Sequence, residues 1–104
     1  MKILTAGHRY ELGNFENKYA AGQIIQFIEK VPEAEGSTVL RTVSDGTTNE
    51  ELLAVLIDRM NSLQAKFPCR ENAVAITHFE TGLLWLQART ANRVARGVEG
   101  KQIK

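Results

Sequence analysis

Two consecutive stretches with helical periodicity, separated by Pro68, occupy the second half of this 104-residue chain. The first follows Thr48, which has the spacing of a capping box to Glu51, and Pro68 ends it because a proline ring cannot continue a helix. The second begins near Arg70 and keeps an apolar stripe until Gly97, a natural helix stop. Helices of about 20 and 26 residues would be roughly 30 and 39 Å long, so the pattern predicts a long helical hairpin. The stripes consist of Leu52, Leu56, Met60, Leu63 and Phe67 in the first helix and of Ala73, Ile76, Phe79, Leu83 and Leu86 in the second.

The first half of the chain is typical of short β-strands separated by turns. Residues 23–28 and 38–43 are rich in β-branched and apolar side chains, and residues 8–12 form a third candidate strand. Glycine and proline place turns between them, at 31–37 and again at 45–46. The pattern predicts an antiparallel sheet of three or four strands.

These elements together predict an α+β fold, in which a small N-terminal antiparallel sheet precedes the hairpin. The length suits a single domain over residues 1–104, divided into a sheet at 1–46, the hairpin at 47–100 and a short C-terminal extension at 101–104. One thin sheet and one hairpin cannot bury apolar faces as long and as wide as those of the predicted helices. We therefore expect a homo-oligomer assembled through the hairpin, with ligand clefts between its subunits.

Several classes of site are not expected. Cys69 is the only cysteine, so no internal disulfide can form and the cytoplasm is the expected compartment. No secretory signal or membrane-spanning run is visible, so we expect no membrane partner. The spacing of Cys69, His8 and His78 resembles no metal site, and no Walker loop, dinucleotide fingerprint or nucleophile elbow is present. We therefore expect no metal, no cofactor and no catalytic residue.

The net charge of +1 is unevenly distributed along the chain. Residues 1–50 carry five cations against seven acids, and residues 51–88 are close to neutral. Residues 89–104, in contrast, carry five cations and a single acid. This asymmetry favours a localised anion site over a surface that binds polyanions, so nucleic acid is not expected as a partner.

Arg89, Arg93 and Arg96 follow one another at spacings of four and three residues, which places them on one face of a helix. Guanidinium groups bind phosphate oxygens in bidentate fashion, so the cluster suits a phosphate or pyrophosphate. Cations in the last turns of a helix also stabilise it through the helix dipole, by about 0.3–1 kcal/mol each. The sequence leaves both roles open.

Aromatic and amide side chains offer contacts for the rest of a nucleotide. Most aromatic residues of a small domain belong to its core, but one at a subunit edge would stack on a purine, which contributes about 1–3 kcal/mol per base. Arg70, Asn72 and Gln26 carry donors and amides that suit base edges and ribose hydroxyls. Polar residues at a helix start also serve simply as caps.

Five segments of the chain form a recognisable set: HRYEL at 8–12, QFI at 26–28, DGTTNE at 45–50, FPCREN at 67–72 and RTANRVARGVEG at 89–100. Together they resemble the bacteriophage Thoeris anti-defence sponges of the first-described type. The helical hairpin of that family is shared with the phage anti-CBASS sponge. The likeness runs from about Gly7 to Gly100, and its C-terminal segment is the most specific part.

The resemblance implies a binding protein rather than an enzyme. Members hold glycocyclic ADP-ribose, a signal made by a defence TIR protein, away from its effector, and some also bind cyclic di- and trinucleotides at separate sites of a hexamer. It implies a dimer or hexamer here, with a cyclic nucleotide signal as the partner. The implied ligand contacts are Arg89, Asn92, Arg93 and Arg96 near the C-terminus, Phe67, Arg70 and Asn72 between the helices, and Arg41, Arg9 and Tyr10 in the strands. A second site for a cyclic oligonucleotide would include Thr77, His78 and Thr81.

Three other functions stay open at this point. An enzyme that opens the cyclic nucleotide would use Glu71, His78 or Glu80. A small nucleic-acid-binding regulator would use the basic C-terminus, with an affinity that falls steeply with salt. A purely structural oligomer would show no thermal shift with any ligand.

Overall fold

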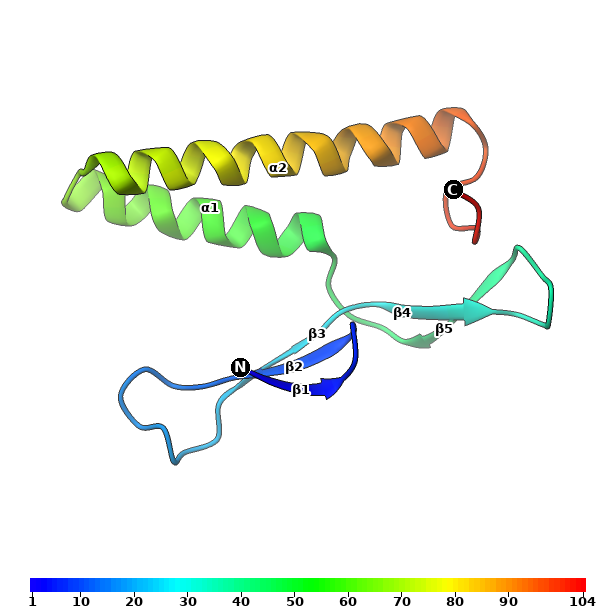
Figure 1. Ribbon diagram of the computed structural model, residues 1–104, viewed down its shortest axis with the longest axis horizontal. Coiled ribbons are helices and arrows are strands. Elements are labelled where there is room, and N and C mark those ends of the chain that lie inside the picture. Colours follow the sequence, from blue (N-terminus) through cyan, green and yellow to red (C-terminus); the bar gives the residue numbers. More distant parts are fainter. The chain divides into compact units, whose positions relative to one another are not determined.

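The computed structural model describes all 104 residues, and its contacts divide the chain into two compact units, Met1–Thr48 and Asn49–Lys104. The first unit contains every strand and the second contains both helices (Figure 1). Strands followed by a helical hairpin confirm the predicted α+β fold class.

The first unit contains five short strands in two antiparallel sheets. β1 (Lys2–Thr5), β2 (Arg9–Leu12) and β3 (Gln23–Gln26) form one sheet in that order, and β4 (Glu29–Pro32) pairs with β5 (Leu40–Ser44) in the other. The three strands expected from the sequence are confirmed as β2, β3 and β5, although each begins or ends a residue or two away from its expected bounds.

The expectation of one sheet with three or four strands was wrong, because two further strands, β1 and β4, divide the region into two sheets. β4 ends at Pro32, which the sequence had placed in a turn. Proline lacks an N–H group but is tolerated here, since each strand of a two-stranded sheet has an unpaired edge. The turn comes directly afterwards, where Glu33 N–H donates to the Val39 carbonyl at 2.8 Å and Gly36 has a φ of 75°.

A short parallel bridge between Phe27 and Thr47 joins the end of this unit to its middle. Thr47 N–H donates to the Gln26 carbonyl at 2.8 Å, and Ile28 N–H donates to the Thr47 carbonyl at 2.9 Å. A Cβ atom on Gly46 would lie 2.7 Å from the carbonyl carbon of Phe27, so the backbone can approach this closely only with glycine there.

The second unit is an antiparallel helical hairpin, in which α1 (Asn49–Lys66) and α2 (Arg70–Ala95) lie side by side (Figure 1). α1 begins directly after Thr48, and Glu50 and Glu51 in its first turn complement the helix dipole. The helices have 18 and 26 residues, close to the expected lengths, and the break falls at Pro68 as predicted.

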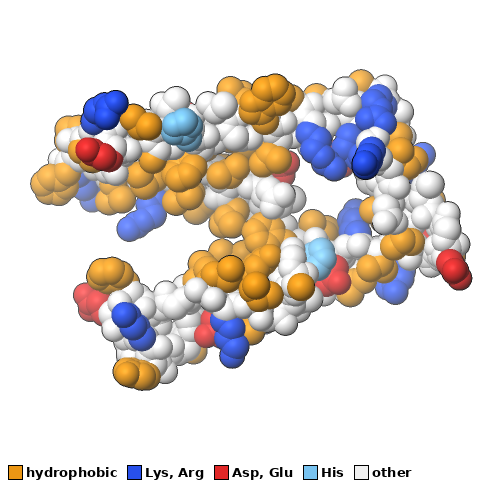
Figure 2. Space-filling view, viewed as in Figure 1, with side chains coloured by type: hydrophobic (Ala, Val, Ile, Leu, Met, Phe, Trp, Pro, Cys, Tyr) orange, Lys and Arg blue, Asp and Glu red, His pale blue; other side chains and the backbone are white.

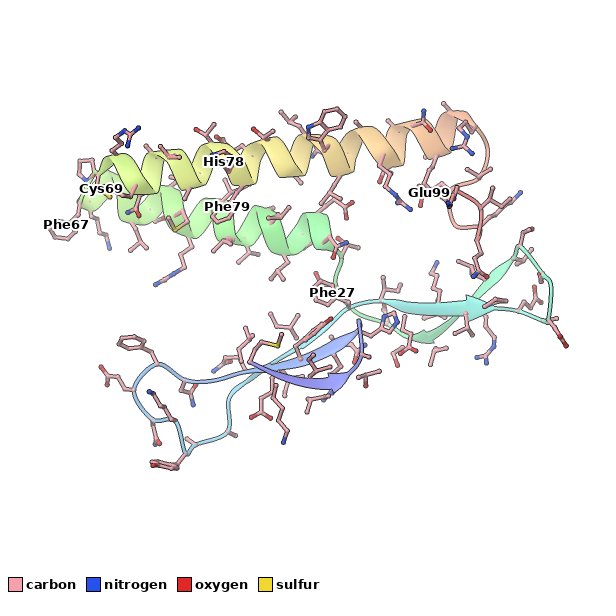
Figure 3. The ribbon with its side chains drawn as sticks, in the orientation of Figure 1. Phe27, Phe67, Cys69, His78, Phe79 and Glu99 are labelled. Atoms are coloured by element: carbon pink, nitrogen blue, oxygen red, sulfur yellow. The ribbon has the colours of Figure 1, made fainter.

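On α2, the predicted apolar stripe faces α1. Ile76 is 7% exposed and is the only buried apolar side chain of the chain, while Phe79, Leu83 and Leu86 are half-buried. Phe79 lies between the two helices (Figure 3). Ala73, the first residue of the predicted stripe, is exposed instead.

On α1, the half-buried apolar side chains are Leu52, Leu53, Ile57 and Met60, so the predicted stripe is confirmed at Leu52 and Met60, and the half-buried face also includes Leu53 and Ile57. Two residues of that stripe, Leu56 and Leu63, are each 38% exposed. The helix therefore carries two adjacent apolar faces, and α2 covers only one of them.

A second uncovered apolar surface lies on α2, opposite the face that packs on α1. Val74, Leu84 and Trp85 are 42%, 65% and 73% exposed, and with Thr81 and Ala88 they form what we call the outer face of α2. Hydrophobic side chains are visible over the surface of the hairpin (Figure 2). Apolar surface of this extent is typical of interaction sites, which is the basis for expecting a homo-oligomer.

Gly82, in the middle of α2, provides a test of helix stability. A Cβ atom at Gly82 would meet nothing within 4 Å, so the hairpin itself does not need a glycine there. We expect Gly82→Ala to stabilise the protein by about 0.8–1 kcal/mol, because alanine has the higher helix propensity. Thermal unfolding followed by circular dichroism would show a rise in Tm of roughly 4–8 °C per kcal/mol.

The matched control is Gly97→Ala, which also adds a methyl group into open space but at a φ of 71°. Because L-residues rarely adopt this conformation, the control should lower the Tm. A lower Tm for Gly82→Ala would contradict the account of open space at this position.

Candidate functional site

The arginine-rich end of α2 stops in a glycine cap. Arg96 is the last residue near helical conformation, and Gly97 follows with a φ of 71°. Gly97 N–H donates to the Val94 carbonyl and Val98 N–H donates to the Arg93 carbonyl, each at 3.0 Å. This pair of bonds is the Schellman motif, which confirms the predicted stop at Gly97.

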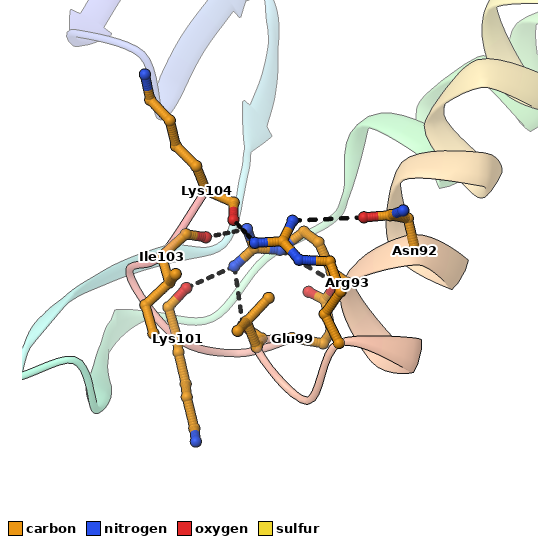
Figure 4. A network of polar contacts seen from close by, with 8 residues as sticks. Asn92, Arg93, Glu99, Lys101, Ile103 and Lys104 are labelled. Carbon is orange, nitrogen blue, oxygen red and sulfur yellow. Dashed lines mark hydrogen bonds and ion pairs between the residues drawn. The ribbon is translucent and has the colours of Figure 1, made fainter.

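The next turn folds the chain back toward the helix that it has just left. Lys101 N–H donates to the Val98 carbonyl at 3.0 Å, and Gly100 occupies the third position of this turn with a φ of 80°. Glycine is favoured at that position because the conformation is strained for other residues. We call residues 98–104 the tail segment; Figure 4 shows it beside the end of α2.

Arg93 is the residue that holds the tail segment, and it is only 7% exposed. Nη2 donates to the carbonyls of Val98 at 2.9 Å and Lys101 at 2.6 Å, and Nη1 donates to the Ile103 carbonyl. Nε lies 3.5 Å from Oε2 of Glu99 (Figure 4). Every nitrogen of the guanidinium group is therefore engaged by an oxygen of the tail segment.

The other members of the arginine cluster are exposed. Arg96 donates from Nη1 to Oδ1 of Asn92 at 3.4 Å and from Nη2 to the Lys104 carbonyl. Arg89 forms no hydrogen bond or ion pair and presents its guanidinium group to solvent. The cluster thus contains one internally engaged arginine, one partly engaged arginine and one free arginine.

The turn between the helices is held by Gln64, which sequence reasoning did not single out. Its Nε2 donates to the Cys69 carbonyl at 2.9 Å, and its Oε1 accepts from Cys69 N–H at 3.1 Å. Phe67 projects from this turn and is 82% exposed, Arg70 is exposed and Asn72 is half-buried. The turn therefore displays an aromatic ring and a guanidinium group from a fixed backbone.

Within one chain, the two groups of candidate residues lie at opposite ends of the hairpin. Figure 3 labels Phe67 and Cys69 at one end and Glu99 at the other. α2 rises 1.5 Å per residue, so Arg70 and Arg93 are roughly 35 Å apart along its axis. The structure does not bring the interhelix residues and the arginine cluster together in a single hairpin.

The strand candidates belong to the first unit. Arg9 is exposed and donates from Nη1 to Oε1 of Gln26 at 3.2 Å. Tyr10 is half-buried and packs edge-to-face on Phe27, with ring centroids 6.0 Å apart. Arg41 is exposed on β5. Arg9 and Tyr10 thus contact side chains of their own unit, whereas Arg41 is exposed.

Thr77, His78 and Thr81 lie on exposed positions of α2. Thr77 Oγ1 donates to the Ala73 carbonyl at 3.1 Å, and Thr81 Oγ1 donates to the Thr77 carbonyl at 2.8 Å. Both hydroxyl protons are used by the helix, while the oxygens keep acceptor capacity toward a ligand.

No group of three or more His, Cys, Asp or Glu side chains is arranged to hold a metal ion. Neither helix combines the length and the hydrophobicity that crossing a bilayer requires.

Two comparisons with known proteins give a match to this chain. A relative from Bacillus phage SBSphiJ7, Thoeris anti-defense 1, is 50% identical over 62 residues, which cover 59% of this chain and 44% of the relative. The chain thus matches less than half of the length of that relative. Residues 38–91 match the family described as the Acb2/Tad1 hairpin domain. This range covers more than half of the 104 residues, and includes β5, α1, the interhelix turn and most of α2. The chain therefore belongs to the Acb2/Tad1 hairpin domain family.

Proposed function

We propose that this protein is a phage anti-defence sponge, which binds a cyclic ADP-ribose-type signalling nucleotide, glycocyclic ADP-ribose, and keeps it from its effector without cleaving it. The observation that carries the proposal is membership of the Acb2/Tad1 hairpin domain family. The name of the relative, Thoeris anti-defense 1, supports Thoeris as the defence system that the protein would counteract. The protein would act in the cytoplasm of the infected bacterium.

The separation of the candidate residues supports a site that two chains share. Two hairpins packed antiparallel would place the interhelix turn of one beside the α2 C-terminus of the other, because these lie at opposite ends of each hairpin. Phe67 and Arg70 of one copy would then contact the base and ribose, while the arginine cluster of the other, Arg93 included, would bind the pyrophosphate. The uncovered apolar faces of α1 and α2 are the surfaces on which the copies would associate.

A second site for a cyclic di- or trinucleotide would use polar side chains of α2, namely Thr77, His78 and Thr81. Thr77 and Thr81 offer acceptor oxygens one turn apart, and His78 is exposed between them.

The proposal requires that the ligand is chemically unchanged when it is released from the protein. The protein should be incubated with glycocyclic ADP-ribose, separated from free ligand and heat-denatured, and the released nucleotide should be analysed by chromatography and mass spectrometry. We expect the released ligand to be unchanged, since the exposed Glu71, His78 and Glu80 form no hydrogen bond to one another. Recovery of an opened or hydrolysed product would instead support the enzyme alternative that uses these residues.

A further inference from the structure

The tail segment surrounds Arg93 with the kind of atoms that a phosphate ligand would offer. Three carbonyl oxygens, from Val98, Lys101 and Ile103, accept its hydrogen bonds, and Glu99 adds a carboxylate oxygen at 3.5 Å from Nε. A pyrophosphate also offers several oxygens to a guanidinium fork. The chain thus fills, from its own backbone, the place where the anion of the proposed function would bind.

The contacts of the tail segment are weaker, atom for atom, than those of an anion. Its three carbonyls are neutral, and its single charged contact comes from Glu99, whose side chain is 41% exposed. Both kinds of bond are charge-assisted because the guanidinium group is ionised, but only a phosphate adds the attraction between opposite formal charges. Exchange of carbonyls for phosphate oxygens at Arg93 is therefore favourable wherever the ligand makes additional contacts.

The tail segment is also built to detach locally. Apart from the half-buried Val98, its residues are exposed, so little apolar burial holds it in place. The chain leaves α2 through Gly97 and turns at Gly100, both with positive φ values. These two glycines permit the segment to swing away without unwinding α2.

We propose that the tail segment is an intramolecular competitor that occupies the Arg93 guanidinium group until a nucleotide displaces it. This inference rests on the proposed function, because it takes Arg93 as a ligand contact. The competitor sets a threshold for binding: the apparent affinity is the intrinsic affinity multiplied by the fraction of molecules with an undocked tail segment. A ligand with one phosphate and no further contacts, such as inorganic phosphate, fails to displace the segment. Glycocyclic ADP-ribose, with a pyrophosphate and a base that can stack, succeeds.

Two substitutions that loosen the tail segment in different ways test the competition. Glu99→Gln removes the one charged contact to Arg93 while keeping the shape of the side chain. Gly100→Ala leaves the charge unchanged but strains the turn at a φ of 80°, and its methyl group would meet nothing within 4 Å. Titration calorimetry of the full chain should show glycocyclic ADP-ribose binding about 3- to 10-fold more tightly in both variants. Asp58→Asn, which changes an exposed carboxylate of α1 without contact to Arg93, is the control and should bind as the wild type does.

Hydrogen exchange provides the second readout. The amide of Lys101, bonded to the Val98 carbonyl, should exchange faster when glycocyclic ADP-ribose is added, and should not respond to inorganic phosphate. Unchanged or weaker binding in both variants, or slower exchange of this amide with ligand, would overturn the inference, since the tail segment would then form part of the site wall. Absence of any binding by the wild type would instead refute the proposed function, a result that the same titration reports separately.

Discussion

Arg93→Ala is expected to weaken the binding of glycocyclic ADP-ribose by roughly one to two decades and to release the tail segment at the same time. A bidentate contact from a charged group contributes about 1.5–3 kcal/mol, which corresponds to this loss of affinity. The same substitution leaves the carbonyls of Val98, Lys101 and Ile103 without their donor, so the segment loses its anchor. Titration calorimetry measures the first effect, and faster exchange of the Lys101 amide measures the second.

Arg89→Ala is the matched control, because Arg89 is exposed and touches no part of the tail segment. This control should also weaken ligand binding, and by more than Arg93→Ala, since no internal competitor offsets the lost contact. The tail segment should keep the exchange rate of the wild type in this variant. Unchanged affinity in Arg93→Ala, together with a released tail segment, would show that Arg93 holds the chain together and does not contact the ligand.

Trp85→Glu is expected to dissociate the proposed homo-oligomer. Trp85 is 73% exposed on the outer face of α2, so its replacement removes little packing within one hairpin. Tryptophan at the centre of an interface contributes about 2–4 kcal/mol, and a carboxylate in its place would have to be desolvated, so association should weaken at least roughly 30-fold. Sedimentation equilibrium would show the mass falling toward that of one chain, with helical content unchanged by circular dichroism.

Gln87→Glu is the control for this experiment, since it places the same charge on an exposed position of α2 outside the outer face. It should leave the assembly intact. Ligand binding should be lost in Trp85→Glu and kept in Gln87→Glu, because one hairpin does not bring its interhelix turn and its arginine cluster together. An assembly that survives Trp85→Glu would place the interface elsewhere, with the exposed leucines of α1 as the next surface to test.

The hairpin was predictable because single residues mark where its helices end. Pro68 breaks the helices and Gly97 ends the second one, and both act through backbone geometry that any sequence context shares. The strands were less accessible. β1 has only four residues, too few to establish a period, and β4 runs into Pro32, which alone is a turn signal. The apolar stripe of α1 was only partly predictable, since Leu52 and Met60 are half-buried as expected, whereas Leu56 and Leu63 are exposed and Leu53 and Ile57 are half-buried instead.

The candidate site was only partly predictable, for a different reason. Helical spacing places Arg89, Arg93 and Arg96 near one another, but it does not distinguish the arginine that is buried from the two that are exposed. The partners of Arg93 are mostly backbone carbonyls, which every residue carries and which leave no mark in a sequence. Gln64 was missed for the same reason, since both of its hydrogen bonds are to the main chain of Cys69.

The two hydrogen bonds between the Gln64 side chain and the main chain of Cys69 affect how much conformational entropy would be lost when a ligand docks. They fix the backbone of the interhelix turn before any ligand arrives, so the ring of Phe67 is displayed from a preorganised loop. Little conformational entropy then has to be surrendered at the moment of capture. A scavenger that must outcompete a receptor for a scarce messenger benefits from such rigidity, since more of each contact is retained as net affinity.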